Sequence, residues 1–263
     1  MGSIGGKKNY KLTISYDGTD FKGWQKQKGS ADDTIQGKLE HIANILNGCE
    51  TAVDGAGRTD AGVHARKQVA SVKIDSDKDA GFIRDYFNRY LPAAISVDGV
   101  EEVPERFHAR LSAREKTYEY NALTAKKAPV FDRKYVYCYG KDVDGEKMKR
   151  ACADLVGTHD FKGFCTASQK KKSTVRTITA ANVTVSETCL PEEGGKIPKT
   201  VRITLSGDGF LYNEVRIIAG TLLEIGSGSL PEDAVRKVLE TCDRRLAGFT
   251  APPEGLFLTD VKY

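Results

Sequence analysis

The sequence predicts an α+β protein with a mixed or antiparallel sheet. Patterns typical of helices and of strands interleave along the chain, but several strand patterns follow one another with no helix between them. The chain has 263 residues, of which 40% are apolar and 29% are charged. A chain of this length and balance folds as one large or two ordinary domains with a substantial core.

Apolar residues at helical spacing, with capping signals at the ends, predict four helices. Asp33 and Gln36 resemble a capping box before the first helix, and Gly48 ends it. The second helix stops before Pro92, and Pro231 lies in the first turn of the last. The predicted helices are 35–46, 82–90, 146–156 and 231–242.

Runs rich in β-branched and aromatic residues predict strands between these helices. The predicted strands are 10–16, 68–74, 116–123, 135–139, 175–185 and 201–206. A boundary near Pro104 to Phe107 would divide the chain into an N-terminal α+β domain, residues 1–105, and a C-terminal α+β domain, residues 106–263.

Several classes of protein do not fit the composition. The longest apolar run, Ile217 to Leu223, is far shorter than the roughly 18 residues of a membrane-spanning helix. The N-terminus lacks the apolar stretch of a signal peptide, so we expect a cytoplasmic protein and no membrane partner. None of the six cysteines forms a CxxC pair or a zinc-ligand spacing with a histidine. We therefore expect reduced thiols and no metal.

The net charge of +4 is small, but the basic residues are unevenly placed. Residues 106–116 carry four fixed positive charges, including Arg110, against one acid. Residues 162–176 carry five and no acid, among them Lys170, Lys171 and Lys172. A single charged run is usually solvated surface, but two such runs beside aromatic residues favour a partner with a phosphate backbone.

The segment Gly55 to Ala65, GAGRTDAGVHA, is the most unusual of the chain. It is not a dinucleotide-binding GxGxxG loop, because the third glycine would fall at Asp60, and it has no Walker Lys-Ser/Thr. The HxE…PCxxC pattern of zinc deaminases is absent, and no second carboxylate is evidently placed for a retaining glycosidase. What remains is a glycine-rich turn that presents the Asp60 carboxylate close behind Arg58.

This segment resembles the signature of the TruA family of tRNA pseudouridine synthases. Further matches run in the family's order from residue 10 to the C-terminus. They comprise Tyr16-Asp17-Gly18-Thr19 with Phe21, Gly23, Trp24 and Gln25, then Phe107-His108-Ala109-Arg110, Lys116-Thr117-Tyr118-Glu119-Tyr120, Gly157-Thr158-His159-Asp160-Phe161, Gly209-Phe210-Leu211-Tyr212 with Val215-Arg216, and Ala251-Pro252-Pro253 with Gly255, Leu256 and Leu258. One position departs: the family usually has Met before the Val-Arg pair, where this chain has Glu214. The sequence leaves open whether Glu214 faces the core or the solvent.

The resemblance implies two RRM-like (ferredoxin-like) halves that share an extended, mixed, largely antiparallel sheet with helices on one face. It implies isomerisation of uridine to pseudouridine at positions 38, 39 and 40 of the tRNA anticodon stem and loop, by a homodimer that uses no cofactor. Asp60 would be the nucleophile, Arg216 its ion-pair partner, and Tyr118 the ring that stacks on the flipped base and helps move a proton. Arg58, Arg110, Leu256 and the three lysines 170–172 would bind substrate, whereas His64 and His108 would support the loops.

Two rival functions have to be weighed against this one. A non-catalytic RNA-binding module would explain the basic runs, but it would have no use for Asp60 or Arg216. A carbohydrate hydrolase could use Asp60 as a nucleophile, but it would require a second essential carboxylate and no basic surface.

Overall fold

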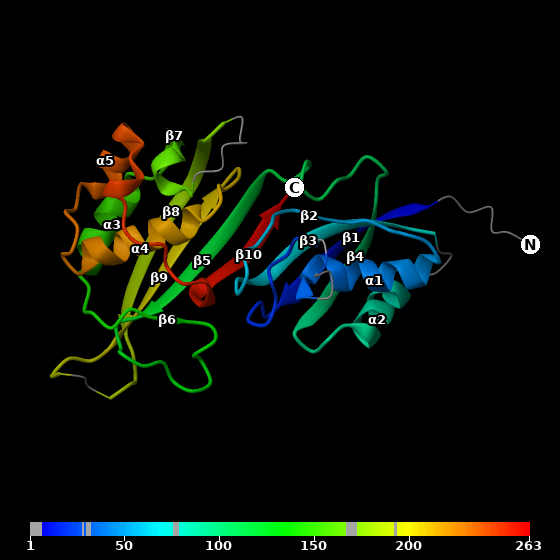
Figure 1. The fold of residues 1–263 in the computed structure, drawn as a ribbon, viewed down its shortest axis with the longest axis horizontal. Helices are drawn as coiled ribbons and strands as arrows, with labels where there is room; N and C mark the ends of the chain where they lie inside the picture. The colour runs from blue at the N-terminus through cyan, green and yellow to red at the C-terminus, as the bar shows by residue number, and fades with distance from the viewer. Residues whose placement is uncertain (1–6, 28, 30–32, 76–78, 167–172, 192–193) are drawn as a thin grey trace, which may run out of the picture. The chain divides into compact units, whose positions relative to one another are not determined.

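The computed structural model describes residues 7–27, 29, 33–75, 79–166, 173–191 and 194–263 (Figure 1). Its described part is α+β, with five α-helices and a ten-stranded sheet that is mixed and mostly antiparallel. Internal contacts divide the chain into two compact units. Unit 1 comprises residues 1–114 and 258–263, and unit 2 comprises residues 115–257. The predicted fold class is confirmed.

Unit 1 is built on β1 (Lys8–Tyr16), which pairs antiparallel with β3 (His64–Ile74) on one side and β4 (Ile95–Val103) on the other. The short strand β2 (Val53–Gly55) extends this sheet along β3. Leu12 and Ile14 of β1 are fully buried, as alternation along a strand with one covered face predicts.

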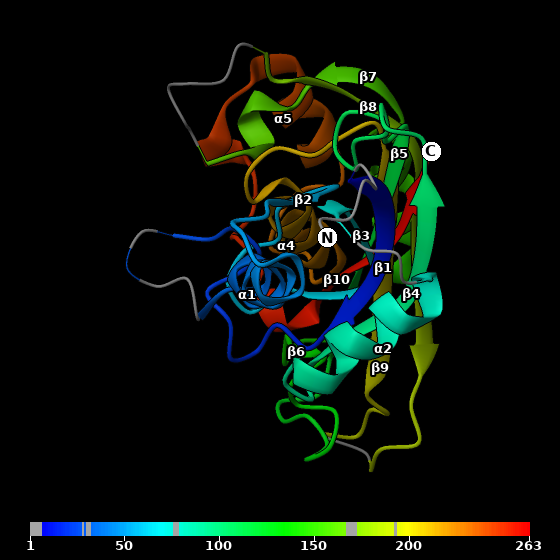
Figure 2. The same cartoon turned by 90° about the vertical axis from the view of Figure 1, so that its right-hand side faces the viewer.

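Helices α1 (Ile35–Asn47) and α2 (Ala80–Tyr90) cover unit 1. They contact each other, and both contact the sheet, so they lie on the same face of it (Figure 2, where α1 is seen almost along its axis). Both were predicted, and α1 starts at Ile35 as predicted, but its capping residue differs from the prediction. The side chain of Thr34, not Asp33, caps it by accepting the Gly37 N–H, while Gly48 ends it in the left-handed conformation as predicted.

Unit 2 contains the antiparallel order β5-β9-β8-β7, and β6 pairs in parallel with β5. These strands are β5 (Glu115–Leu123), β6 (Tyr137–Cys138), β7 (Gly157–Asp160), β8 (Val175–Glu187) and β9 (Lys199–Gly207). The strand predicted over 135–139 is thus reduced to two residues. The last strand of the chain, β10 (Leu256–Lys262), was not predicted.

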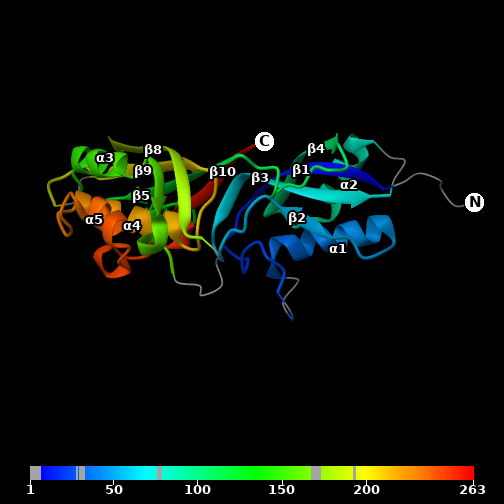
Figure 3. The ribbon, with the colours of Figure 1, turned by 90° about the horizontal axis from the view of Figure 1, so that it is seen from above.

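Helices α3 (Gly145–Ala153) and α4 (Glu214–Gly226) pack on the sheet of unit 2 and on each other, and α5 (Ala234–Thr241) packs on both helices. Helix α4 contacts α3, α5 and β5, and it lies beside α5 in Figure 3. Eleven of its residues are buried, so it is apolar on nearly every side and lacks the one-sided stripe by which α1 and α2 were predicted. The last helix begins at Ala234 rather than at Pro231.

Candidate active site

Asp60 lies in the loop that connects β2 to β3 in unit 1. Its carbonyl accepts the Val63 N–H at 3.2 Å, and Gly62 between them adopts a φ of 77°, so residues 60–63 form a closed turn. A left-handed residue at this position favours glycine. The turn leaves Asp60 partly buried and Arg58, two residues earlier, exposed.

The segment after β1 holds this loop by its backbone. Trp24 donates its N–H to the carbonyl of Thr59 at 3.0 Å. Gly23, with a φ of 90°, lies so close that a Cβ there would meet the Thr59 oxygen at 2.6 Å. A Cβ at Gly18 would come within 2.0 Å of the Val63 oxygen. The two glycines therefore permit the close approach of two chain segments that begin about 40 residues apart in sequence. Each segment carries one of the motifs that match the family.

His64 follows the loop directly, as the first residue of β3. It is 1% exposed, and its Nδ1 accepts the backbone N–H of Gly18 at 3.0 Å. The same Nδ1 lies 3.3 Å from a carboxylate oxygen of Asp17. These contacts link the residue after the loop to the segment that follows β1.

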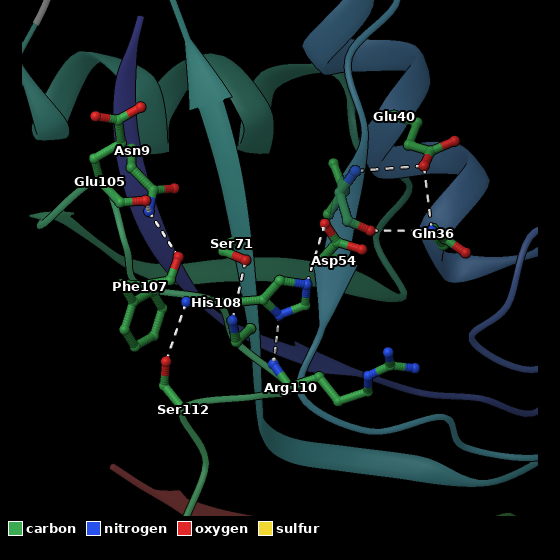
Figure 4. Close-up of polar contacts among 12 residues, drawn as sticks. Asn9, Gln36, Glu40, Asp54, Ser71, Glu105, Phe107, His108, Arg110 and Ser112 are labelled. Carbon is green, nitrogen blue, oxygen red and sulfur yellow. Dashed lines mark hydrogen bonds and ion pairs between the residues drawn. The ribbon is translucent and has the colours of Figure 1, made fainter.

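Arg110 lies in a segment whose backbone is held by several hydrogen bonds (Figure 4). Its own N–H donates to Nδ1 of His108 at 3.1 Å, and the Ala109 N–H donates to Oγ of Ser71 at 3.1 Å. The carbonyl of Ala109 accepts the hydroxyl of Tyr263 at 2.8 Å. The side chain of Arg110 is exposed, so unit 1 carries two exposed guanidinium groups in the matching motifs, at Arg58 and Arg110.

Tyr118 lies in unit 2, on β5 opposite Leu205 of β9. It is 7% exposed, and its ring meets Phe210 edge to face, with centroids 5.2 Å apart and an interplanar angle of 82°. Such a pair fixes the plane of the tyrosine ring. Phe210 belongs to the matching Gly209–Tyr212 motif, which gives that motif a physical role.

Arg216 lies in the first turn of α4, also in unit 2, and is partly exposed. Its Nε donates to the carbonyl of Ala251 at 2.7 Å, and its Nη1 donates to Oδ1 of Asn213 at 3.0 Å. The backbone of Ala251 donates in turn to the Arg216 carbonyl at 3.0 Å. Asn213 adopts a φ of 62°, a left-handed conformation that asparagine tolerates better than most residues. Sequence reasoning assigned no role to Asn213, and its residue type alone gave no signal.

Glu214, the departure from the family pattern, is buried at 1% exposure and is the first residue of α4. Its carboxylate accepts the Leu211 N–H at 2.6 Å. A carboxylate also interacts favourably with the positive end of a helix dipole. The position therefore faces the interior, where a methionine would also fit by size, and the carboxylate contributes a hydrogen bond.

The remaining predicted site residues can be placed only by their element, burial or unit. Leu256 is 5% exposed at the start of β10. Lys170, Lys171 and Lys172 lie outside the described residues. Arg58, Asp60 and Arg110 belong to unit 1, and Tyr118, Arg216 and Leu256 to unit 2. Within the described residues, no group of three or more His, Cys, Asp or Glu could hold a metal ion.

Comparison with known proteins gives a consistent result over most of the chain. The sequence model of one family, described as tRNA pseudouridine synthase, matches residues 12–112 and 151–263. The chain is 43% identical over 255 residues to tRNA pseudouridine synthase A 2 of Bacillus anthracis, covering 97% of this chain and 99% of that protein. It is 41% identical over 256 residues to tRNA pseudouridine synthase A of Caldicellulosiruptor bescii, covering 97% of this chain and all of that protein.

Proposed function

Because the chain belongs to the TruA family of tRNA pseudouridine synthases, and is an isomerase that acts on tRNA, we propose that it modifies uridines 38, 39 and 40 of the anticodon stem and loop. The N-glycosidic bond of the uridine breaks, the uracil turns, and a carbon–carbon glycosidic bond forms. C5 loses its proton and N1 gains one, so the composition of the nucleotide is unchanged and no electron is transferred. The proposed reaction therefore uses no cofactor.

Asp60 is the proposed nucleophile, and the turn around it is the observation that carries the proposal. Trp24 holds the carbonyl of Thr59, and the Asp60–Val63 turn holds the carbonyl of Asp60, so the backbone that carries the carboxylate is anchored. Two routes are open to it: attack on C1′ of the ribose, or removal of the proton from C2′. Both require an ionised carboxylate.

Arg216 is the proposed ion-pair partner of Asp60, because a partly buried carboxylate stays ionised more readily beside a cation. Two hydrogen bonds, to Ala251 and Asn213, hold the guanidinium and support a positioning role. The N-terminal part of the chain would thus supply the nucleophile, and the C-terminal part would supply the arginine and the tyrosine.

Extraction of the base from its stack costs a few kcal/mol, and stacking on an aromatic ring returns about 1–3 kcal/mol. We assign this stacking to Tyr118, whose ring is oriented by Phe210, and the Tyr118 hydroxyl also suits proton transfer. Leu256 would pack against the base. Arg58 would fill the vacated space or grip a phosphate, and Arg110 with Lys170, Lys171 and Lys172 would bind the RNA backbone.

The assembly and location follow from the family in the same way. We propose a cytoplasmic homodimer with no membrane partner. In the described part of the chain, no helix is both long enough and apolar enough to cross a membrane.

Release of tritium from tRNA that carries [5-³H]uridine tests the proposal, because the carbon–carbon bond forms at C5 and expels that hydrogen. The wild-type protein should release tritium, and Asp60→Ala should release none while still binding tRNA. Turnover undiminished in Asp60→Ala would rule out the nucleophile. Binding without tritium release by the wild type would instead indicate a non-catalytic RNA-binding module.

A further inference from the structure

A chain of buried hydrogen bonds links β1 to the loop of Asp60. The hydroxyl of Tyr16, the last residue of β1, lies 2.8 Å from Oγ1 of Thr59, the residue immediately before Asp60. Gln68 of β3 reaches the same hydroxyl with its Nε2 at 3.4 Å and the carbonyl of Gly57 at 3.0 Å. All three side chains are buried: Tyr16 is 5% exposed, Thr59 6% and Gln68 0%.

The amide of Gln68 sets the direction of the bonds that it makes itself. Its Oε1 accepts the Val69 N–H at 3.2 Å, so the other end of the amide is the NH₂ group, which donates to Gly57 and to Tyr16. The Tyr16 oxygen thus accepts from Gln68, and in the Tyr16–Thr59 bond either hydroxyl can be the donor. Hydrogen bonds that form a connected network in a buried site reinforce one another.

We propose that Tyr16, Thr59 and Gln68 form a clamp that positions the loop for the isomerisation. The clamp holds the two neighbours of Arg58, and the second of these is also the residue before Asp60. Gln68 fixes Gly57, and Tyr16 fixes Thr59, which also receives the Trp24 N–H on its carbonyl. Arg58 therefore projects between two anchored residues, and Asp60 follows the second. The three side chains act as positioning residues and do not react. This inference rests on the proposed role of Asp60.

The phenol stays protonated at neutral pH. Burial raises the pKa of Tyr16 to about 12, although the hydrogen bonds with Thr59 and Gln68 act in the opposite direction. Hydroxyl removal by Tyr16→Phe leaves the ring in place beside Trp24, whose centroid is 6.2 Å away. The variant therefore isolates the hydrogen bond from the packing.

The test is the single-turnover rate of tritium release with enzyme in excess, together with the Kd for tRNA. Tyr16→Phe and Thr59→Val should each lower the rate by about tenfold or more, with the Kd unchanged within about twofold, because a small misplacement of a reacting group lowers the rate strongly. The double variant should be no slower than the slower single variant, because both remove the same bond. Thr59→Ser keeps the hydroxyl and should retain the wild-type rate.

Tyr10→Phe is the matched control, since Tyr10 lies on the same strand and is 1% exposed but is not part of the clamp. It should leave the rate unchanged. A wild-type rate in Tyr16→Phe, or rate losses that multiply in the double variant, would overturn the clamp. The same assay on Asp60→Asn separates the two proposals: an inactive Asp60→Asn beside a fully active Tyr16→Phe refutes the clamp alone, whereas an active Asp60→Asn refutes the proposed nucleophile.

Discussion

At the scale of single residues, Glu214 illustrates how a buried polar group can replace an apolar one. Its carboxylate accepts the Leu211 N–H at 2.6 Å, and Leu211 itself is 5% exposed. Methionine, which the family usually has here, would fill similar space but would leave that N–H without its acceptor. A buried donor that loses its partner costs about 1–3 kcal/mol.

Glu214→Met should therefore lower the free energy of unfolding by about 1–3 kcal/mol in urea denaturation. Glu214→Gln keeps an oxygen acceptor and should lose less. The exposed Glu240 of α5 provides the control, and Glu240→Gln should change little. A Glu214→Met variant as stable as the wild type would show that the hydrogen bond does no more than offset the cost of burying the carboxylate.

The buried phenol of Tyr16 leads to a second prediction, on how the stability of the protein depends on pH. Its pKa in the folded protein is about 12, against an ordinary value of 10.0. Because the folded value is raised, the stability from the protonated phenol is fully present below about pH 10 and is lost as the pH rises toward 12. The loss is at most about 3 kcal/mol over these two units.

Urea denaturation at pH 9 and pH 11 measures this loss. The wild type should lose more stability between these values than Tyr16→Phe, which has no phenol to ionise. Burial also raises the pKa of Tyr120 and Tyr263, but those groups are common to both proteins. Equal losses in the two proteins would contradict the raised pKa of Tyr16.

At the scale of elements, the loop of Asp60 is built jointly with the segment after β1. Gly18 lies against the backbone of Val63, where a Cβ would come within 2.0 Å of the carbonyl oxygen. Backbone cannot rotate away as a side chain can, so the segments must separate. Gly99 in β4 is different, since its Cβ would meet only Thr13 at 3.8 Å, an ordinary contact.

Gly18→Ala should destabilise unit 1 by about 3 kcal/mol, the upper end of the usual cost of overpacking, and should lower the rate of tritium release. Gly99→Ala should leave both nearly unchanged. Circular dichroism melts and the tritium assay on the two variants check this. A Gly18→Ala protein with wild-type stability and rate would contradict the described approach of the two segments.

The burial pattern of each element explains whether the sequence could predict it. Helices α1 and α2 have one apolar stripe each and clear ends, such as Gly48 and Pro92, so periodicity found them. Helix α4 is buried on nearly all sides, so its apolar run Ile217 to Leu223 gives no helical period. Strand β4 was missed because Gly99 and the acids Glu101 and Glu102 interrupt its β pattern.

Some residues of the candidate site could likewise be predicted from the sequence, and some of its contacts could not. Asp60 and Arg58 stand out because several special residue types are concentrated in eleven positions. The bond that holds the loop does not stand out, since Tyr16 and Thr59 are 43 residues apart and nothing in either motif indicates that they pair. Tyr16 ends the strand predicted over 10–16 and is buried, but its hydroxyl bond to Thr59 depends on how the segments fold together.

At the scale of the whole molecule, the net charge of +4 is too small to indicate RNA, and the placement of the charges matters more. Each Lys or Arg that neutralises a phosphate releases a counterion, so tRNA binding weakens as salt is added. The three lysines 170–172 belong to a run with no acid, from 162 to 176. Lys149 and Lys237 are instead ion-paired with Glu146 and Asp233.

Replacement of Lys170, Lys171 and Lys172 by alanine should reduce the slope of log Kd against log salt by about two to three, while single-turnover chemistry stays largely intact. Filter binding from low to high salt measures the slope. Lys149→Ala with Lys237→Ala should leave it unchanged. An unaltered slope in the triple variant would mean that these lysines are solvated and do not contact RNA.

In the mechanism we propose, the Asp60 carboxylate drives pseudouridine formation in the anticodon stem and loop. The most direct test is to map pseudouridine by carbodiimide modification and primer extension, in a tRNA transcript with uridines at 38, 39 and 40, after treatment with wild-type protein or Asp60→Asn. The wild type should place pseudouridine at those positions, and Asp60→Asn should place none while binding the transcript with an unchanged Kd. Pseudouridine formed by Asp60→Asn at the wild-type rate would contradict the claim.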